Sequence, residues 1–109
     1  MFSFTKKADL YEFSPAGLHE ALAAKRVILV DVREPDEHAA ARIEGALNLP
    51  LSGFNPAALP KGAVVLHCGI GKRSRAAADL CAKAGVPLAG HLAGGLSAWS
   101  AAGLPIRQG

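Results

Sequence analysis

The chain has 109 residues, half of them hydrophobic and 19% charged, and this composition excludes an intrinsically disordered protein. The formal net charge of +3 is small and most of its cations are scattered, so charge gives no reason to expect a nucleic-acid partner. No stretch approaches the roughly 20 apolar residues that a membrane-spanning helix needs.

Length and cysteine content set expectations for domain organisation and compartment. We expect one domain over residues 1–109, with a loose N-terminal extension at residues 1–9. Residues 1–7 lack the apolar core of a secretion signal. Because a free reactive thiol favours a reducing compartment, the sequence predicts a cytoplasmic protein.

The first part of the chain predicts an edge strand, a helix and a buried strand. Residues 10–13 alternate in polarity, as in a short edge strand. Ser14 and Pro15 form a helix-start signal, with Ser14 as the N-cap and Pro15 at the first helical position, and this helix is expected to end near Lys25. Residues 27–32 are almost continuously apolar, which favours a parallel strand covered on both faces.

Two opposite charges follow at the end of this strand. Asp31 is interpreted as a structural carboxylate that accepts hydrogen bonds. Arg33 either pairs with Asp31 or a neighbouring acid, or forms a surface ion pair worth about 0–1 kcal/mol, and the sequence leaves both open. A short helix is expected to begin at Pro35, with His38 as a solvated residue on it.

The chain is organised around a strand, a glycine-rich basic loop and a helix that begins soon after the loop. The apolar run of residues 64–67 ends at Cys68, and Gly69 and Gly71 follow. Glycine allows the backbone to turn tightly and direct its N–H groups inward. Together with the amino end of the next helix, such N–H groups form an anion site. We therefore expect Cys68 to be held as a thiolate nucleophile.

Three cations lie beside this thiol: Lys72, Arg73 and Arg75. The helix dipole disfavours cations at a helix start, so their presence there indicates an anionic ligand rather than only a solvated surface. The spacing of a phosphate-binding Walker loop is absent.

The last third of the chain predicts a helix, a short strand and a final helix. The first helix is expected to run to Ala84, with Ala77, Leu80, Cys81 and Ala84 on one face and Cys81 as buried core. Residues 86–89 are read as a strand, residues 91–95 as a tight connection and residues 96–102 as a helix with Trp99 in the core. His67 and His91 lie nearest the loop, but neither shows a triad partner, so no general base is assigned.

The order of these elements predicts the fold class. Strands that alternate with helices indicate an α/β fold in three layers, with a small parallel sheet of four or five strands between helices on both faces. The loop that carries the cysteine would join the central strand to its helix.

Three motifs together resemble the rhodanese-like domain family, in its single-domain thiosulfate sulfurtransferase form. Cys68-x4-Arg73-Ser74 resembles the rhodanese loop, in which six residues from Cys to Arg wrap a thiol that carries an extra sulfur. The other two motifs are Asp31-Val32-Arg33-Glu34 and Gly94-Gly95-Leu96-Ser97-Ala98-Trp99 with Gly103-Leu104-Pro105. The resemblance extends over residues 13–106. It departs where the family usually has Gly-His and this chain has Ala41 and Arg42.

The resemblance implies a sulfurtransferase with Cys68 as its catalytic residue. Asp31 and Arg33 would border the pocket and brace it. The implied partners are a small anionic sulfur donor (thiosulfate, a persulfide or a polysulfide) and a thiol acceptor (glutathione, thioredoxin or a protein thiol), with cyanide as a test acceptor. No metal or organic cofactor is expected. The loop residues that would bind the donor are Gly69, Ile70, Gly71, Lys72, Arg73 and Ser74.

Two other functions remain as alternatives. A sulfur-carrier or binding module that depends on a protein partner would have the same sequence features. Phosphatases and arsenate reductases resemble this loop but have Cys-x5-Arg, whereas Cys68 and Arg73 are separated by four residues. The shorter loop favours a sulfur atom over a tetrahedral oxyanion.

Overall fold

The computed structural model describes residues 10–109, and the predicted extension at residues 1–9 lies outside them. A five-stranded sheet has the order β1-β6-β5-β2-β4, and every adjacent pair is parallel. Its strands are β1 (Glu12–Phe13), β2 (Ile28–Asp31), β4 (Leu47–Asn48), β5 (Val64–His67) and β6 (Gly90–Leu92). The helices are α1 (Pro15–Ala23), α2 (Pro35–Ala40), α3 (Lys72–Lys83) and α4 (Gly95–Ala101). The predicted parallel α/β fold is therefore confirmed.

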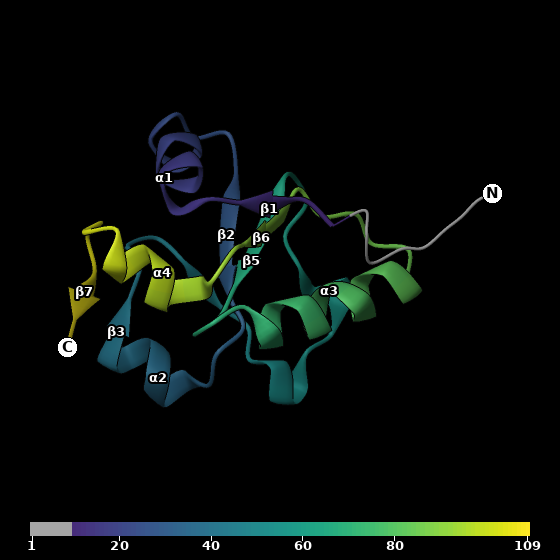
Figure 1. The fold of residues 1–109 in the computed structure, drawn as a ribbon. Helices are drawn as coiled ribbons and strands as arrows, with labels where there is room; N and C mark the ends of the chain where they lie inside the picture. The colour runs from purple at the N-terminus through teal and green to yellow at the C-terminus, as the bar shows by residue number, and fades with distance from the viewer. Residues whose placement is uncertain (1–9) are drawn as a thin grey trace.

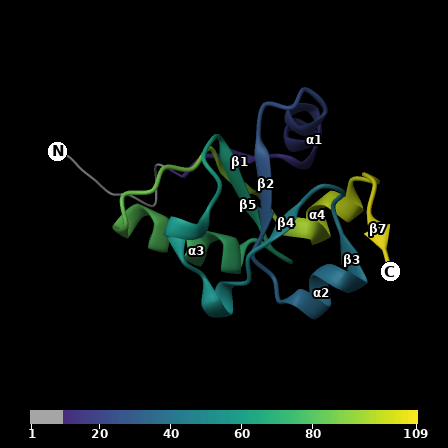
Figure 2. The same ribbon diagram turned by 180° about the vertical axis from the view of Figure 1, so that it is seen from behind.

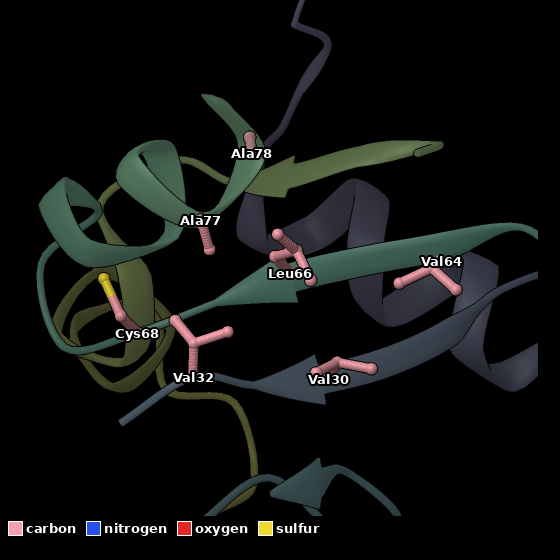
Figure 3. Close-up of a cluster of buried hydrophobic side chains, with 7 residues drawn as sticks. All are labelled: Val30, Val32, Val64, Leu66, Cys68, Ala77 and Ala78. Atoms are coloured by element: carbon pink, nitrogen blue, oxygen red, sulfur yellow. The ribbon is translucent and has the colours of Figure 1, made fainter. Parts of the chain in front are cut away.

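The helices cover the sheet on both faces, as expected. In Figure 1, α3 lies on one side of the sheet, and α1 and α4 lie on the other. Each face has its own apolar cluster. The cluster under α3 contains Val30, Val32, Val64, Leu66, Cys68, Ala77 and Ala78 (Figure 3). The cluster under α1 and α4 contains Leu18, Leu29, Ile43, Val65, Leu92 and Trp99.

A second, two-stranded sheet pairs β3 (Ala41–Arg42) with β7 (Arg107–Gln108) in antiparallel fashion. Figure 2 shows this pair beside α2 and α4, next to the C-terminus. The sequence does not predict this sheet, because strands of only two residues are too short to show a periodic pattern. The other short elements are the 3-10 turns Leu51–Gly53 and Pro56–Ala58.

Helix starts and stops follow the predicted local chemistry. The Ser14 hydroxyl accepts a hydrogen bond from the Gly17 N–H at 3.0 Å, and Pro15 occupies the first helical position. This capping satisfies a backbone donor that would otherwise lack an intrahelical partner. Helix α3 ends at Lys83, and Gly85 takes the left-handed conformation (φ 72°) that terminates it.

The predicted strand at residues 86–89 is wrong, because the strand is β6 at Gly90–Leu92. Strand β6 lies between β5 and β1 and pairs on both sides. Pro87 has no N–H to donate in such a position, and the N–H of Val86 donates to Cys81 O at 2.9 Å instead. Gly90, the first residue of β6, has no room for a side chain, because a Cβ there would lie 2.5 Å from Tyr11 O.

The predicted buried face of α3 is partly wrong. Cys81 is buried as expected, but Leu80 is 41% exposed and Ala84 is exposed. The buried face is rotated by about one residue and consists of Ser74, Ala77, Ala78 and Cys81. Burial raises the pKa of the Cys81 thiol, which keeps it protonated and unreactive.

Within residues 10–109, no helix combines the length and hydropathy needed to cross a membrane.

The two central strands carry the loops of interest. After β2 the polypeptide continues toward β4, at one edge of the sheet, and after β5 it continues to β6, in the direction of the opposite edge. The carboxyl ends of two parallel strands whose connections diverge in this way form a crevice, where open α/β sheets bind their ligands. Cys68 and residues 32–34 both lie at this end of the sheet.

Candidate active site

Cys68 lies directly after the central strand β5, at the floor of a short loop. The Gly71 N–H donates to Cys68 Sγ at 3.1 Å, and the Ser74 N–H donates to the same atom at 3.3 Å. Gly71 has φ 104°, a left-handed conformation that glycine adopts without strain, and it is the N-cap of α3. Figure 3 shows the sulfur directed toward the first turn of α3. Two backbone donors and a helix start therefore converge on the sulfur.

The outer side of the loop is held by the start of α4. The Leu96 N–H donates to Cys68 O at 2.8 Å, and the Ser97 N–H donates to Gly69 O at 2.9 Å. These two amides are among those that a helix start leaves without an intrahelical acceptor. The start of α4 therefore fixes the direction of the Cys68 and Gly69 carbonyls and holds the outer side of the loop in place.

The rim of the loop combines an apolar side chain with cations. Ile70 is 63% exposed, and Lys72 is exposed at the first position of α3. The Arg73 guanidinium makes a bidentate contact with the Glu37 carboxylate of α2, at 2.7 Å from Nη1 and 3.1 Å from Nη2. This hydrogen-bonded contact lowers the pKa of Glu37 and raises that of Arg73. Arg75 pairs with Glu12 of β1.

Asp31 and Arg33 form a buried ion pair, so a surface pair is excluded for Arg33. Arg33 Nη2 lies 2.7 Å from Asp31 Oδ2, and Arg33 Nε lies 3.0 Å from Oδ1. Asp31 is fully buried, and Arg33 is only 5% exposed. Burial opposes ionisation of Asp31, but hydrogen bonds from Arg33 and His38, together with the electrostatic effect of nearby His67, outweigh it and lower the pKa of the carboxyl.

The prediction that His38 is a solvated helix residue is wrong. His38 Nδ1 lies 2.8 Å from Asp31 Oδ2, and the His38 side chain is 19% exposed. The short helix α2 turns back over the end of β2, and a buried carboxylate accepts every donor within its reach. His38 therefore belongs to the polar cluster around Asp31.

His67 connects this polar cluster to the loop. The register pairs Asp31 of β2 with His67 of β5, and His67 Nε2 lies 3.7 Å from Asp31 Oδ2. On its other side, His67 Nδ1 lies 3.1 Å from Cys68 O, a distance that suits an Nδ1–H donor. Burial lowers the pKa of His67, so the ring is neutral. His67 thus lies between the Asp31 carboxylate and the loop, and it contacts the loop through Nδ1.

His91 has partners that the sequence analysis did not find. Its Nδ1 lies 2.8 Å from Ser74 Oγ, and its Nε2 lies 3.1 Å from Glu12 Oε2. Glu12 and His91 are 79 residues apart in the chain and meet only because β1 pairs with β6. The sequence signal for this contact was a polar residue within each of two short strands.

Within residues 10–109, no group of three or more His, Cys, Asp or Glu is placed to hold a metal ion.

Comparisons with known proteins agree with this geometry. The chain is 44% identical over 95 residues to an uncharacterized protein of Synechocystis, which covers 84% of this chain and 53% of that protein. The chain thus spans about half the length of that relative. A protein of Allochromatium vinosum named sulfurtransferase is 37% identical over 99 residues, with 87% of this chain and 92% of that protein covered.

A solved structure and a family match complete the comparison. The crystal structure of a rhodanese-related protein from Thermoplasma volcanium superimposes with a TM-score of 0.78 at 28% identity, and covers 89% of this chain and 98% of that chain. Residues 14–102 match the rhodanese-like domain. This match includes the cysteine loop, the Asp31–Arg33 pair and the glycine pair that begins α4. The chain therefore belongs to the rhodanese-like domain family, which includes sulfurtransferases.

Proposed function

We propose that this protein transfers a sulfane sulfur from an anionic donor to a thiol acceptor through a persulfide on Cys68. The observation that carries the proposal is the pair of backbone donors, from Gly71 and Ser74, at 3.1 and 3.3 Å from Cys68 Sγ. Charge-assisted hydrogen bonds of this kind contribute roughly 1.5–3 kcal/mol each to an anion. They favour the negative charge of a thiolate on Cys68 Sγ, the form that attacks the donor.

The proposed reaction is a double displacement. The Cys68 thiolate attacks the outer sulfur of thiosulfate, a new S–S bond forms, and sulfite leaves with the electron pair of the broken bond. A persulfide or polysulfide donor would react in the same way and release a thiolate. An acceptor thiolate (glutathione, thioredoxin or a protein thiol), or cyanide in an assay, then attacks the outer sulfur and Cys68 thiolate is regenerated. Lys72 and Arg73 would orient the anionic donor.

The burial of Cys68 supports transfer of a small atom. Cys68 is fully buried at the floor of the loop, and only four residues separate it from Arg73. A single sulfur atom fits above such a floor more readily than a tetrahedral phosphate. Both cysteines are free, and because a free catalytic thiol requires reducing surroundings, the proposed location is the cytoplasm.

The test is to incubate reduced protein with thiosulfate and measure its intact mass. A gain of one sulfur atom that is lost on adding cyanide, with formation of thiocyanate, is the expected result. Cys68→Ser should neither gain sulfur nor form thiocyanate, whereas the matched variant Cys81→Ala should do both. Sulfur loading in Cys68→Ser would overturn the assignment of the nucleophile.

Other donors separate the remaining alternatives. Loading by glutathione persulfide but not by thiosulfate would retain the mechanism and change the donor. No loading by either would favour a carrier that needs a protein partner, and hydrolysis of an aryl phosphate would favour a phosphatase.

A further inference from the structure

A buried chain of hydrogen-bonding groups leads away from the nucleophile. Cys68 Sγ lies 3.7 Å from Ser74 Oγ, Ser74 Oγ lies 2.8 Å from His91 Nδ1, and His91 Nε2 lies 3.1 Å from Glu12 Oε2. Ser74 is fully buried and His91 is 2% exposed. Only the last member, Glu12, is at the surface, where its side chain is 49% exposed. This series of hydrogen-bonding groups therefore links the buried sulfur to the exposed Glu12 carboxylate.

Strand register produces this arrangement. Glu12 of β1 pairs with His91 of β6, and His91 pairs with Leu66 of β5. Aligned residues of neighbouring parallel strands place their side chains on the same face of a sheet. Leu66 belongs to the cluster under α3, so Glu12 and His91 also face α3. Ser74 lies on the buried side of that helix.

The donors and acceptors present determine the direction of each hydrogen bond in this series. Glu12 is ionised, because the hydrogen bond with His91, followed by the one from Arg75, lowers the pKa of its carboxyl. A carboxylate only accepts hydrogen bonds, so His91 Nε2 carries a proton and, in the neutral ring, Nδ1 is an acceptor. The Ser74 O–H then donates to Nδ1. A Ser74 lone pair is left to accept the S–H of Cys68, and Gly71 O, 3.2 Å from Ser74 Oγ, competes for the same hydroxyl proton.

We propose that His91 takes up the proton of Cys68 through the hydroxyl of Ser74. The S–H bond of Cys68 breaks as an O–H bond forms on Ser74, and the original hydroxyl proton of Ser74 moves to His91 Nδ1. The net result is transfer of one proton from Sγ to Nδ1, with no change of oxidation state. It forms a thiolate and an imidazolium that faces the Glu12 carboxylate. This deepens the proposed function, since it supplies the thiolate on which that function rests.

The surrounding charges are arranged for this transfer. The Glu12 carboxylate on β1 stabilises an imidazolium, and Arg75 on α3 partly offsets it through its pairing with Glu12. Of the cations at the loop, Arg73 pairs with Glu37, and Lys72 is exposed. Asp31, with Arg33, His38 and His67, lies around the ends of β2 and β5, and of these four residues His67 contacts the loop, at Cys68 O. His91 acts through Ser74, so it is a positioning residue and not one that touches the substrate.

The first test compares the protonation state of His91 in the reduced wild-type protein and in Cys68→Ala. Nitrogen-15 NMR of the imidazole reports that state as a function of pH. His91 should be protonated over a pH range in which the wild-type Cys68 is ionised, and neutral over the same range in Cys68→Ala. Identical His91 titration curves in the two proteins would overturn the proposal. This measurement needs no sulfur donor, so it tests the proton transfer alone. The intact-mass measurement described above tests the proposed sulfur transfer.

The second test measures how fast iodoacetamide alkylates Cys68 at neutral pH. His91→Asn retains a hydrogen-bonding group but cannot take up the proton, so the alkylation rate should fall about tenfold. The fall is limited because an ordinary cysteine is still a few per cent thiolate at neutral pH. The matched control is His19→Asn, since His19 is exposed on α1 and its variant should react at the wild-type rate.

A surface variant covers the case in which His91→Asn does not fold. Glu12→Gln removes the charge that faces His91, and it should also slow alkylation and change its pH profile. Glu44→Gln is its control, because Glu44 also pairs with an arginine (Arg107, 2.9 Å) but is 74% exposed. Equal rates in the wild type and Glu12→Gln, or equal slowing in Glu12→Gln and Glu44→Gln, would overturn the proposal.

Discussion

Gly95 lies so close to Cys68 that a Cβ on Gly95 would be 2.5 Å from the Cys68 carbonyl oxygen. The same Cβ would lie 2.6 Å from the carbonyl carbon and oxygen of Gly69. This close approach lets Leu96 and Ser97 hold the outer side of the loop with their N–H groups. The start of α4 therefore determines where the Cys68 and Gly69 carbonyls point and holds the loop in position.

Gly95→Ala should displace the loop and abolish most of the sulfur transfer. The atoms in the way are backbone and cannot rotate aside. Displacement of a catalytic group by about 1 Å can cost roughly 100-fold in rate, and we expect a loss of that order in thiocyanate formation. Gly103→Ala is the control, because Gly103 also has a positive φ (76°) but no atom within 4 Å of its Cβ position. It should lose about 1–2 kcal/mol of stability through backbone strain and keep its activity. Full activity in Gly95→Ala would contradict this account of the loop.

Glu37→Gln should tighten the binding of an anionic donor. The Glu37 carboxylate occupies the guanidinium of Arg73, so an incoming anion competes with it. Both side chains are more than one third exposed (37% and 38%), and such pairs contribute about 0–1 kcal/mol. Removing the charge should lower KM for thiosulfate by up to about fivefold, with a smaller effect at high salt.

Steady-state kinetics in thiosulfate would measure this effect. Glu44→Gln removes a carboxylate from a different and more exposed ion pair (Glu44 is 74% exposed) and should leave KM unchanged. A higher KM in Glu37→Gln would show that Glu37 orients Arg73 for the donor rather than competing with it.

Asp31→Asn should destabilise the fold strongly. It would leave the buried Arg33 without its counter-charge, and removal of one partner of a buried ion pair costs about 3–5 kcal/mol. Urea unfolding measures the change in the free energy of unfolding. Glu44→Gln, which breaks the exposed pair with Arg107, should change it by less than about 1 kcal/mol. Similar losses of unfolding free energy in the two variants would show that burial does not increase the contribution of the Asp31–Arg33 pair to stability.

Stability should fall as the pH is lowered from neutral, because His67 is buried and neutral. Burial lowers its pKa in the folded state, whereas an unfolded histidine titrates near about 6.5. Below that pH the unfolded state binds a proton that the folded state does not, which favours unfolding by up to about 1.4 kcal/mol per pH unit. Because the pKa of Asp31 is lowered in the folded state, a further loss is expected below about pH 4, where unfolded carboxylates bind protons.

Urea unfolding at a series of pH values tests this dependence. His67→Gln should flatten the slope between neutral and mildly acidic pH, while the exposed His19→Gln should retain it. A wild-type slope in His67→Gln would assign the acid sensitivity to other groups.

Much of the fold was predictable because its signals are local. The Ser14-Pro15 helix start, the apolar runs at β2 and β5 and the glycines that follow α3 and α4 each act within a few residues. The error at β6 has the opposite origin. The hydrophobic residues at 86–89 favoured a strand, but the two-sided pairing of β6 excludes Pro87 from it.

The cysteine loop is the part of the site that the sequence by itself determined. A short run of residues places Gly71 and Ser74 around the sulfur of Cys68, since the turn and the helix start are local features. The same holds for the Asp31–Arg33 pair, whose partners are two residues apart. These local motifs are also what identified the family.

Only the tertiary structure decided the partners that come from different elements. Arg73 and Glu37 lie 36 residues apart, and His91 and Glu12 lie 79 apart. Their contacts depend on how α2 packs against the loop and on the register between β1 and β6. Because a shift of one residue in that register would turn Glu12 to the other face of the sheet, no pattern along the chain could assign it to His91.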